Sequence, residues 1–198
     1  MNVLLMLSRA IDRTNDRVGR LVIWLILAST VISGLTAIVR KAFGTSSIAY
    51  LEVQWYLFAA AFLLAAGYTL LHGEHVKIDV IASRLSKRKQ IWIDIIGFTL
   101  FLAPVCLVIL WYGWPFFLQG FRSGEMSSNA GGLVRWPVYL MIPIGFVLLL
   151  LQGLSELVKR IAFLKGLIPD PTQKVVARSA EEELAEELRR KAEAEGRA

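Results

Sequence analysis

The sequence has 198 residues, of which 56% are hydrophobic and 11% aromatic, and its formal net charge is +6. A soluble domain of this length needs a more polar surface than this composition supplies, so we expect an integral membrane protein. The basic residues stand at the ends of apolar runs, so the charge indicates membrane topology and argues against a nucleic-acid partner. The single cysteine, Cys106, lies inside an apolar run, which excludes an internal disulfide and a cysteine metal site.

Residues 1–20 have two distinct helical faces. Leu4, Leu7 and Ile11 fall on one face, while four arginines follow one another at roughly four-residue steps on another. We therefore expect an amphipathic arm on the membrane surface, with Arg13 and Arg17 as lipid-interface anchors. The long apolar stretch begins only at residue 21, and no convincing cleavage site follows it, so we expect this helix to be retained.

Four apolar runs are long enough to cross the membrane, which takes ~20 helical residues for ~30 Å of hydrocarbon. They predict an all-α membrane domain at residues 21–160, with spans at 21–39, 52–71, 91–118 and 137–157. The third run exceeds one crossing, and a tilt, a kink at Pro104 or an emergent end near Pro115 would absorb the excess. Small residues in the second span would let a helix of a partner protein approach closely.

Charged side chains crowd the segment between the second and third spans. Ile78, Ile81 and Leu85 fall on one face of a helix, and basic residues cluster beside them. We expect a short interfacial helix here, in the headgroup layer of the membrane. The expected lipid anchors of this segment are Arg84, Lys87, Arg88 and Trp92.

The distribution of basic residues also predicts the topology. Twelve lysines and arginines near the spans belong to the arm, to the segment between spans two and three, and to the segment after span four; four belong to the other two loops. This asymmetry places both termini and the middle segment in the cytoplasm. Aromatic residues flank the opposite ends of the spans and predict an outer interfacial belt that includes Trp136. Residues 161–198 form a charged cytoplasmic tail, either helical or disordered.

The sequence offers little catalytic or cofactor chemistry. The two histidines, His72 and His75, are three residues apart, whereas bis-histidine haem ligation needs ligands on both sides of the ring. Together with Glu74 and Asp79 they have metal-ligand chemistry, but their spacing matches no metal motif, and pairing with nearby basic residues explains the acids more simply. No span carries an acid near its middle, and no phosphate-binding loop or nucleophile elbow is present. We expect no enzyme activity, cofactor or bound metal.

Four stretches of the sequence resemble one family of membrane proteins. The first is LEVQWYLF, in which Glu52 opens the second span, and the next is AAGYTLLHGEHVKIDVIASRLSKR. The later ones are SGEMSSNAGGLVRWP and the fourth span, YLMIPIGFVLLLLQGLSELVKR. Over roughly residues 18–167 the sequence is similar to the small membrane subunit of tripartite ATP-independent periplasmic (TRAP) transporters. The tail after Pro171 lies outside this resemblance.

The resemblance implies a small scaffold subunit in a bacterial or archaeal inner membrane. In such a transporter, a periplasmic binding protein captures an organic anion, by default a carboxylate, and a large multi-span permease subunit moves it with the sodium gradient. The small subunit would brace the permease, contact membrane lipids and bind no nucleic acid. The competing class is a stand-alone four-span protein, such as a small exporter or an assembly factor, and neighbouring genes would distinguish the two.

Two groups of residues are candidates for contacts with these partners. The group in the cytoplasmic hairpin, which would shape it or contact the large subunit, is Glu74, His75 and Asp79. The group in and beside the periplasmic loops, which would help to receive the binding protein through complementary charge, is Glu52, Arg122, Glu125 and Arg135. For Glu125, an internal tie to one of the two arginines is an equally good alternative.

Overall fold

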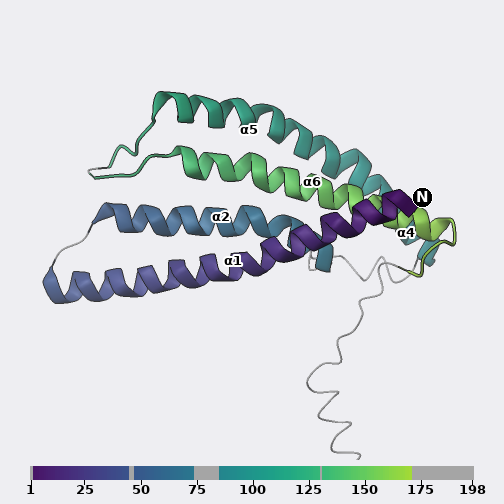
Figure 1. Cartoon of the computed structure of the whole chain (residues 1–198), viewed down its shortest axis with the longest axis horizontal. Helices are drawn as coiled ribbons and strands as arrows, with labels where there is room; N and C mark the ends of the chain where they lie inside the picture. The colour runs from purple at the N-terminus through teal and green to yellow at the C-terminus, as the bar shows by residue number, and fades with distance from the viewer. Residues whose placement is uncertain (1, 45–46, 74–84, 130, 171–198) are drawn as a thin grey trace, which may run out of the picture.

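The computed structural model describes residues 2–44, 47–73, 85–129 and 131–170 (Figure 1). Within these ranges, four helices are long and apolar enough to cross a membrane. They are α1 (Asn2–Phe43), α2 (Ile48–His72), a continuous helical stretch from Lys87 to Ser123, and α6 (Trp136–Leu164). The same ranges contain no β-strand, only an isolated bridge between Met126 and Val134. The predicted all-α membrane fold with four crossing helices is confirmed.

The stretch from Lys87 to Ser123 changes its winding once. It consists of α4 (Lys87–Ile96), the π-helical turn η1 (Gly97–Leu102) and α5 (Ala103–Ser123). Pro104 is the second residue of α5, and it has no N–H to donate to the carbonyl of Leu100, which lies four residues earlier in the π turn. The wider π turn accommodates this missing bond, so the stretch remains helical. Pro115 lies inside α5, which nevertheless continues to Ser123.

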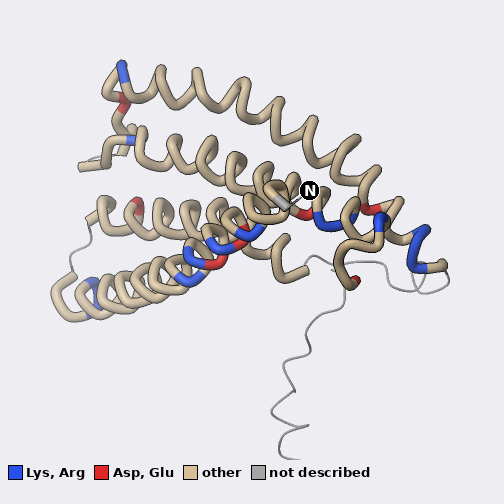
Figure 2. Tube along the Cα trace, turned by 45° about the vertical axis from the view of Figure 1, so that its right-hand side comes forward, with Lys and Arg blue, Asp and Glu red and all other residues tan. Residues whose placement is uncertain are grey.

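The long helices lie side by side in the order α1, α2, α6, α5 (Figure 1). α6 packs against α1, α2 and α5, so it is the central helix of the layer. The loop between α5 and α6 (residues 124–135, the α5–α6 hairpin) lies at one end of the layer with the start of α2 and the end of α1; we call this the hairpin end. The start of α1, α4 and the end of α6 lie at the opposite end, the N-terminal end, where charged residues are concentrated (Figure 2).

Small residues bring the helices of the layer close together. A Cβ atom on Gly145 of α6 would lie 2.7 Å from the Leu63 carbonyl oxygen of α2, closer than a real Cβ approaches. Gly67 of α2 is buried against the Asn15 side chain of α1 and the Leu148 carbonyl of α6, and a Cβ would collide there too. The sequence predicts that the small residues of the second span receive a helix of a partner protein; at Gly67 they receive α1 and α6 of the same chain.

Several helix ends differ from the expected span limits. α1 runs without a break through the expected arm and the first span, so residues 2–43 form one helix. α2 begins at Ile48 and α6 continues to Leu164, so both helices include flanking residues beyond the apolar run. The expected interfacial helix falls largely on residues 74–84, and the tail on residues 171–198, which lie outside the described residues. The surface position of the arm stays a prediction.

Candidate functional site

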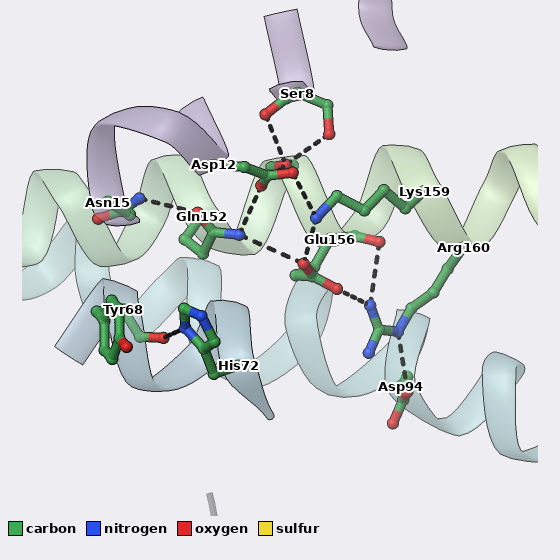
Figure 3. Close-up of polar contacts among 11 residues, drawn as sticks. Ser8, Asp12, Asn15, Tyr68, His72, Asp94, Gln152, Glu156, Lys159 and Arg160 are labelled. Carbon is green, nitrogen blue, oxygen red and sulfur yellow. Dashed lines mark hydrogen bonds and ion pairs between the residues drawn. The ribbon is translucent and has the colours of Figure 1, made fainter. Parts of the chain in front are cut away.

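Polar side chains gather where the first turns of α1 cross the last turns of α6 (Figure 3). Spacings of three and four residues place each set on one face of its helix. α1 and α6 therefore meet along polar faces, although each has an apolar stretch long enough to cross a membrane. The residues of α1 are Ser8, Asp12 and Asn15, and those of α6 are Gln152, Ser155, Glu156, Lys159 and Arg160.

Gln152 is the centre of the uncharged part of this contact, and its side chain has no exposed surface. Its amide oxygen accepts a hydrogen bond from Asn15 Nδ2 at 2.8 Å, and its amide nitrogen donates to Asp12 Oδ1 at 2.9 Å. Ser155 Oγ donates to the same Asp12 oxygen at 2.8 Å and lies 2.6 Å from Ser8 Oγ. Buried polar groups are costly to leave unpaired, so these bonds fix the register of α1 on α6.

Five charged side chains of alternating sign continue the contact into α4 (Figure 3). Lys159 Nζ lies 2.8 Å from Asp12 Oδ2 and 2.7 Å from Glu156 Oε1. The other Glu156 oxygen accepts a hydrogen bond from Arg160, whose Nε lies 2.8 Å from Asp94 Oδ2. We call these five residues the charge chain. It joins α1, α6 and α4 at the N-terminal end of the layer, and its formal charge is −1.

Arg160 is the most enclosed member of the charge chain, with 6% of its side chain exposed. Carboxylates of Glu156 and Asp94 flank it, and its Cζ lies 4.7 Å from the centre of the Phe98 ring in η1. A buried cation is tolerated when it is paired and hydrogen-bonded, and both conditions are met here. The neighbouring Asp94 ties this part of α6 to the helix that carries the π turn.

The charge chain lies near one end of the apolar length of α6. This helix has 29 residues, whereas a bilayer core is ~30 Å thick and takes about 20 residues. Counted from Trp136 at 1.5 Å per residue, Glu156 falls about 30 Å along the helix, which equals the thickness of the hydrocarbon core. A span that begins at Trp136 would end at Glu156, where long charged side chains reach the headgroups.

A second polar contact, at the hairpin end, is made by Glu52 of α2. Its carboxylate accepts hydrogen bonds from the Ser127 hydroxyl, from Asn129 Nδ2 at 2.9 Å and from the Leu133 backbone N–H at 2.7 Å. Tyr56, one turn further along α2, donates to the Val134 carbonyl at 3.1 Å. Glu52 is 3% exposed, so its carboxylate is directed at the α5–α6 hairpin and away from solvent.

Glu125 and Arg135 face each other across the α5–α6 hairpin. Arg135 Nη1 lies 3.0 Å from Glu125 Oε1, which also accepts a hydrogen bond from the Tyr139 hydroxyl at 2.9 Å. Bonding to Tyr139 and Glu125 raises the pKa of the Arg135 guanidinium above its ordinary value. Arginine is a cation at every physiological pH even without such a shift. The internal tie considered for Glu125 is formed with Arg135. Arg122 is exposed on the last turn of α5.

The other candidate residues are spread over the surface of the described chain. Those on α1, Arg13 and Arg17, are exposed, as are Arg88 and Trp92 on α4. Lys87 Nζ lies 3.0 Å from Asp170 Oδ2, and the Trp136 ring meets the Phe121 ring edge-on at 5.5 Å between centroids. The remaining candidates, Glu74, His75, Asp79 and Arg84, lie outside the described residues.

In the described part of the chain, no group of three or more His, Cys, Asp or Glu side chains is placed to hold a metal ion. The rings of His72 and Tyr68 are in contact, and His72 Nδ1 lies 3.1 Å from the Tyr68 carbonyl oxygen. The other ring nitrogen of His72, Nε2, lies 4.0 Å from Asp16 Oδ1. Sequence analysis named none of the residues of the contact between α1, α6 and α4 as site candidates, neither the uncharged ones nor those of the charge chain. Their polar three- and four-residue spacing was the available signal, but it also fits a solvated helix face.

The fold defines a multi-pass α-helical membrane protein. Polar contacts within the chain hold its helices together at both the hairpin end and the N-terminal end of the layer. Residues 29–163 match the family model described as "Tripartite ATP-independent periplasmic transporters, DctQ component". The match covers more than half of the chain, and the protein belongs to this family. It is therefore one component of a tripartite transporter. The family is a family of transporter components and not of enzymes. Neither the curated proteins nor the solved structures contain a match to the chain.

Proposed function

We propose that this chain is the small scaffold subunit of a sodium-coupled secondary transporter that imports an organic anion, by default a carboxylate. A periplasmic binding protein delivers the anion, and a large multi-span permease subunit holds the substrate and sodium sites. The family match over residues 29–163 is the observation that carries this proposal. The chain itself braces the permease in the membrane.

The engagement of acidic side chains supports a role without ion transport. Ionisable side chains that serve an ion path through the membrane face the bundle interior or a water-filled cavity. Glu52, Asp94 and Glu156, which lie on spanning helices, accept hydrogen bonds or ion pairs from groups of this same chain. Each lies toward one end of the layer, so these acids serve the shape of the scaffold.

The open layer supports a role in packing against a larger membrane protein. α5 has α6 as its main long-helix partner, and side chains along it are widely exposed, with Trp111 at 77% and Tyr112 at 71%. A surface of this size needs lipid or another membrane protein to cover it. A scaffold fixed at both ends by polar contacts can hold its tilt while the permease moves, helped by Trp92, Trp136 and the arginines at the interfaces.

The proposed orientation places the N-terminal end and the charge chain at the cytoplasmic face of the inner membrane. The excess of basic residues at that end of the spans supports it. The α5–α6 hairpin then lies in the periplasm, where Arg122, Glu125 and Arg135 help to dock the binding protein. Because Arg135 also pairs with Glu125, the sharper test is Arg122→Glu alone beside the double Arg122→Glu, Arg135→Glu variant. Unchanged docking and transport in both would rule the docking role out.

The stretch that most resembles the family contains Glu74, His75 and Asp79. We propose that these residues hold the cytoplasmic hairpin in shape or contact the large subunit. The test is a triple alanine variant of these residues. Full co-purification with the permease and normal transport by this variant would count decisively against the proposal.

The first experiment is a pull-down of the tagged chain from membranes in mild detergent, with identification of stoichiometric partners. We expect a large multi-span permease. A monodisperse chain with no partner, or a homodimer, would contradict the scaffold role and favour a stand-alone exporter or assembly factor.

A further inference from the structure

We infer that Glu52 is a positioning residue, whose carboxylate holds the α5–α6 hairpin in one shape as a preformed docking surface for the soluble component of the transporter. This inference rests on the proposed function, because it needs the hairpin end to face the periplasm. It also gives Glu52 a different role from the one expected from the sequence, in which its charge would contact the binding protein directly. A carboxylate that is 3% exposed acts on a partner through the hairpin, without touching it.

The three hydrogen bonds of Glu52 come from both arms of the hairpin. Ser127 and Asn129 belong to the arm that leaves α5, and both donate to Oε1. The Leu133 N–H belongs to the arm that enters α6, and it donates to Oε2. One carboxylate therefore holds the two arms together and fastens both to α2. Charge-assisted hydrogen bonds of this kind are stronger than bonds between neutral groups.

The two arms also pair with each other next to the carboxylate. The Ser127 N–H donates to the Leu133 carbonyl at 2.9 Å, and the Arg135 N–H donates to the Glu125 carbonyl at 2.9 Å. These bonds flank the antiparallel bridge between Met126 and Val134. A bridge of one residue pair is too short to be stable alone, so its shape depends on the anchors to α2.

The pairing places two apolar side chains on one face of the hairpin. Directly opposed residues of an antiparallel pair point to the same side, and here they are Met126, 60% exposed, and Val134, 39% exposed. The ion pair of Glu125 and Arg135 stands beside them. An apolar centre with a charged rim is the usual composition of a protein interface, and methionine adapts readily to a facing surface.

The soluble component is the occupant that this surface fits. The hairpin joins the ends of two spanning helices, so it extends from the membrane on the aqueous side, and both signs of charge accompany its apolar pair. A loop that is ordered before the encounter loses less conformational entropy when it binds. Because docking must recur in every transport cycle, a fixed hairpin favours repeated, rapid association.

The test measures binding of the purified, substrate-loaded binding protein to the complex of this chain and its permease in nanodiscs. Glu52→Gln keeps the shape of the side chain but turns one acceptor into a donor. We expect at least fivefold weaker binding and unchanged co-purification with the permease. Asp16→Asn, which removes one negative charge at the other end of the layer, is the matched control and should bind within twofold of wild type.

A spin label on Ser128→Cys, in a Cys106→Ala background, reports the mobility of the hairpin independently of binding. Glu52→Gln should raise the mobility of the label, and the double variant Glu52→Gln, Asn129→Asp, which restores a donor–acceptor pair, should reverse at least half of both effects. Unchanged binding in Glu52→Gln would overturn the inference, as would weaker binding with unchanged mobility, since that result would assign the effect to charge alone.

Two further outcomes are distinguishable from these. If Glu52→Gln fails to co-purify with the permease, Asn129→Ala removes a single donor from an exposed residue; it should weaken binding at least twofold and raise mobility, and unchanged binding would overturn the inference. If the wild-type complex itself binds no binding protein, the proposed docking role and this inference fall together. Wild-type binding that Glu52→Gln leaves intact overturns the inference alone.

Discussion

Arg160 Nε and Asp94 Oδ2 meet at 2.8 Å although the two residues are 66 positions apart in the sequence. Their contact fastens the last turns of α6 to α4, just before the π turn that contains Phe98. Because Glu156 contacts Arg160 from the same helix, the guanidinium links Glu156 of α6 to Asp94 of α4 in the charge chain. The layer therefore depends on one enclosed cation at its N-terminal end.

Replacing Arg160 with methionine should destabilise the protein more than any other single change in the charge chain. Asp94 would lose its contact with Arg160, Glu156 would keep only Lys159 as a cation partner, and breaking a buried ion pair in this way costs about 3 kcal/mol or more. The measurement is the free energy of unfolding in mixed micelles of increasing SDS content. Lys165→Met, at an exposed position just after α6, is the control and should lie near wild type. An Arg160→Met variant as stable as this control would contradict the prediction.

Lys159 and Asp12 should show non-additive effects on stability. Lys159→Met leaves Asp12 and Glu156 close together without their shared cation, whereas adding Asp12→Asn removes one of the two charges. We expect the double variant to be more stable than the sum of the single changes predicts, by about 1 kcal/mol. A double-mutant cycle of unfolding free energies measures this coupling, and strict additivity would show that the pair contributes little.

Gly145 should tolerate no side chain, because α2 and α6 touch through backbone at this position. A Cβ there meets the Leu63 carbonyl oxygen and carbon, which cannot move without moving α2. We expect Gly145→Ala to cost about 1 to 3 kcal/mol, the range typical of overpacking. Gly34→Ala in α1 is the matched control, since nothing lies within 4 Å of the added atom, and it should be neutral or slightly stabilising. Equal stability of the two variants would contradict the close approach.

Gln152→Met keeps the volume of the side chain but removes its hydrogen bonds to Asn15, Asp12 and Glu156. Leaving buried donors and acceptors unpaired costs about 1 to 3 kcal/mol for each such group. The expected result is a lower free energy of unfolding together with faster proteolysis of the first turns of α1. Gln119→Met, at an exposed site on α5, supplies the comparison. Indistinguishable proteolysis of the two variants would show that Gln152 does not hold α1 in place.

The spanning helices were predictable because the bilayer constrains them directly. Hydrocarbon requires about 20 apolar residues in a row and internal pairing of the backbone, so the runs after residues 21, 52, 91 and 137 specify helices. Their ends were less predictable: the arm expected at residues 1–20 continues into the first span as one helix, and its polar side chains find partners on α6.

Those partners could not be read from the sequence. Asn15 and Gln152 are 137 positions apart, and the pairing depends on how α1 crosses α6. Glu52 shows the same limit: its place at the start of the second span suggests a residue open to a partner, but the fold brings the hairpin over it, 75 to 81 positions away. The pair of Glu125 and Arg135 is separated by ten positions and was accordingly among the alternatives considered.

The charge chain also has a consequence for the order in which the protein is made. Synthesis inserts α1 with Asp12 first and α4 with Asp94 later, but both cations of the chain, Lys159 and Arg160, belong to α6, the last of the described spanning helices. Until the translocon releases α6, neither earlier carboxylate has its partner. Assembly of the N-terminal end of the layer therefore waits for α6. A nascent chain that stops before α6 leaves α1 and α4 without these ion pairs, and we expect membrane proteases to degrade it faster than the full chain.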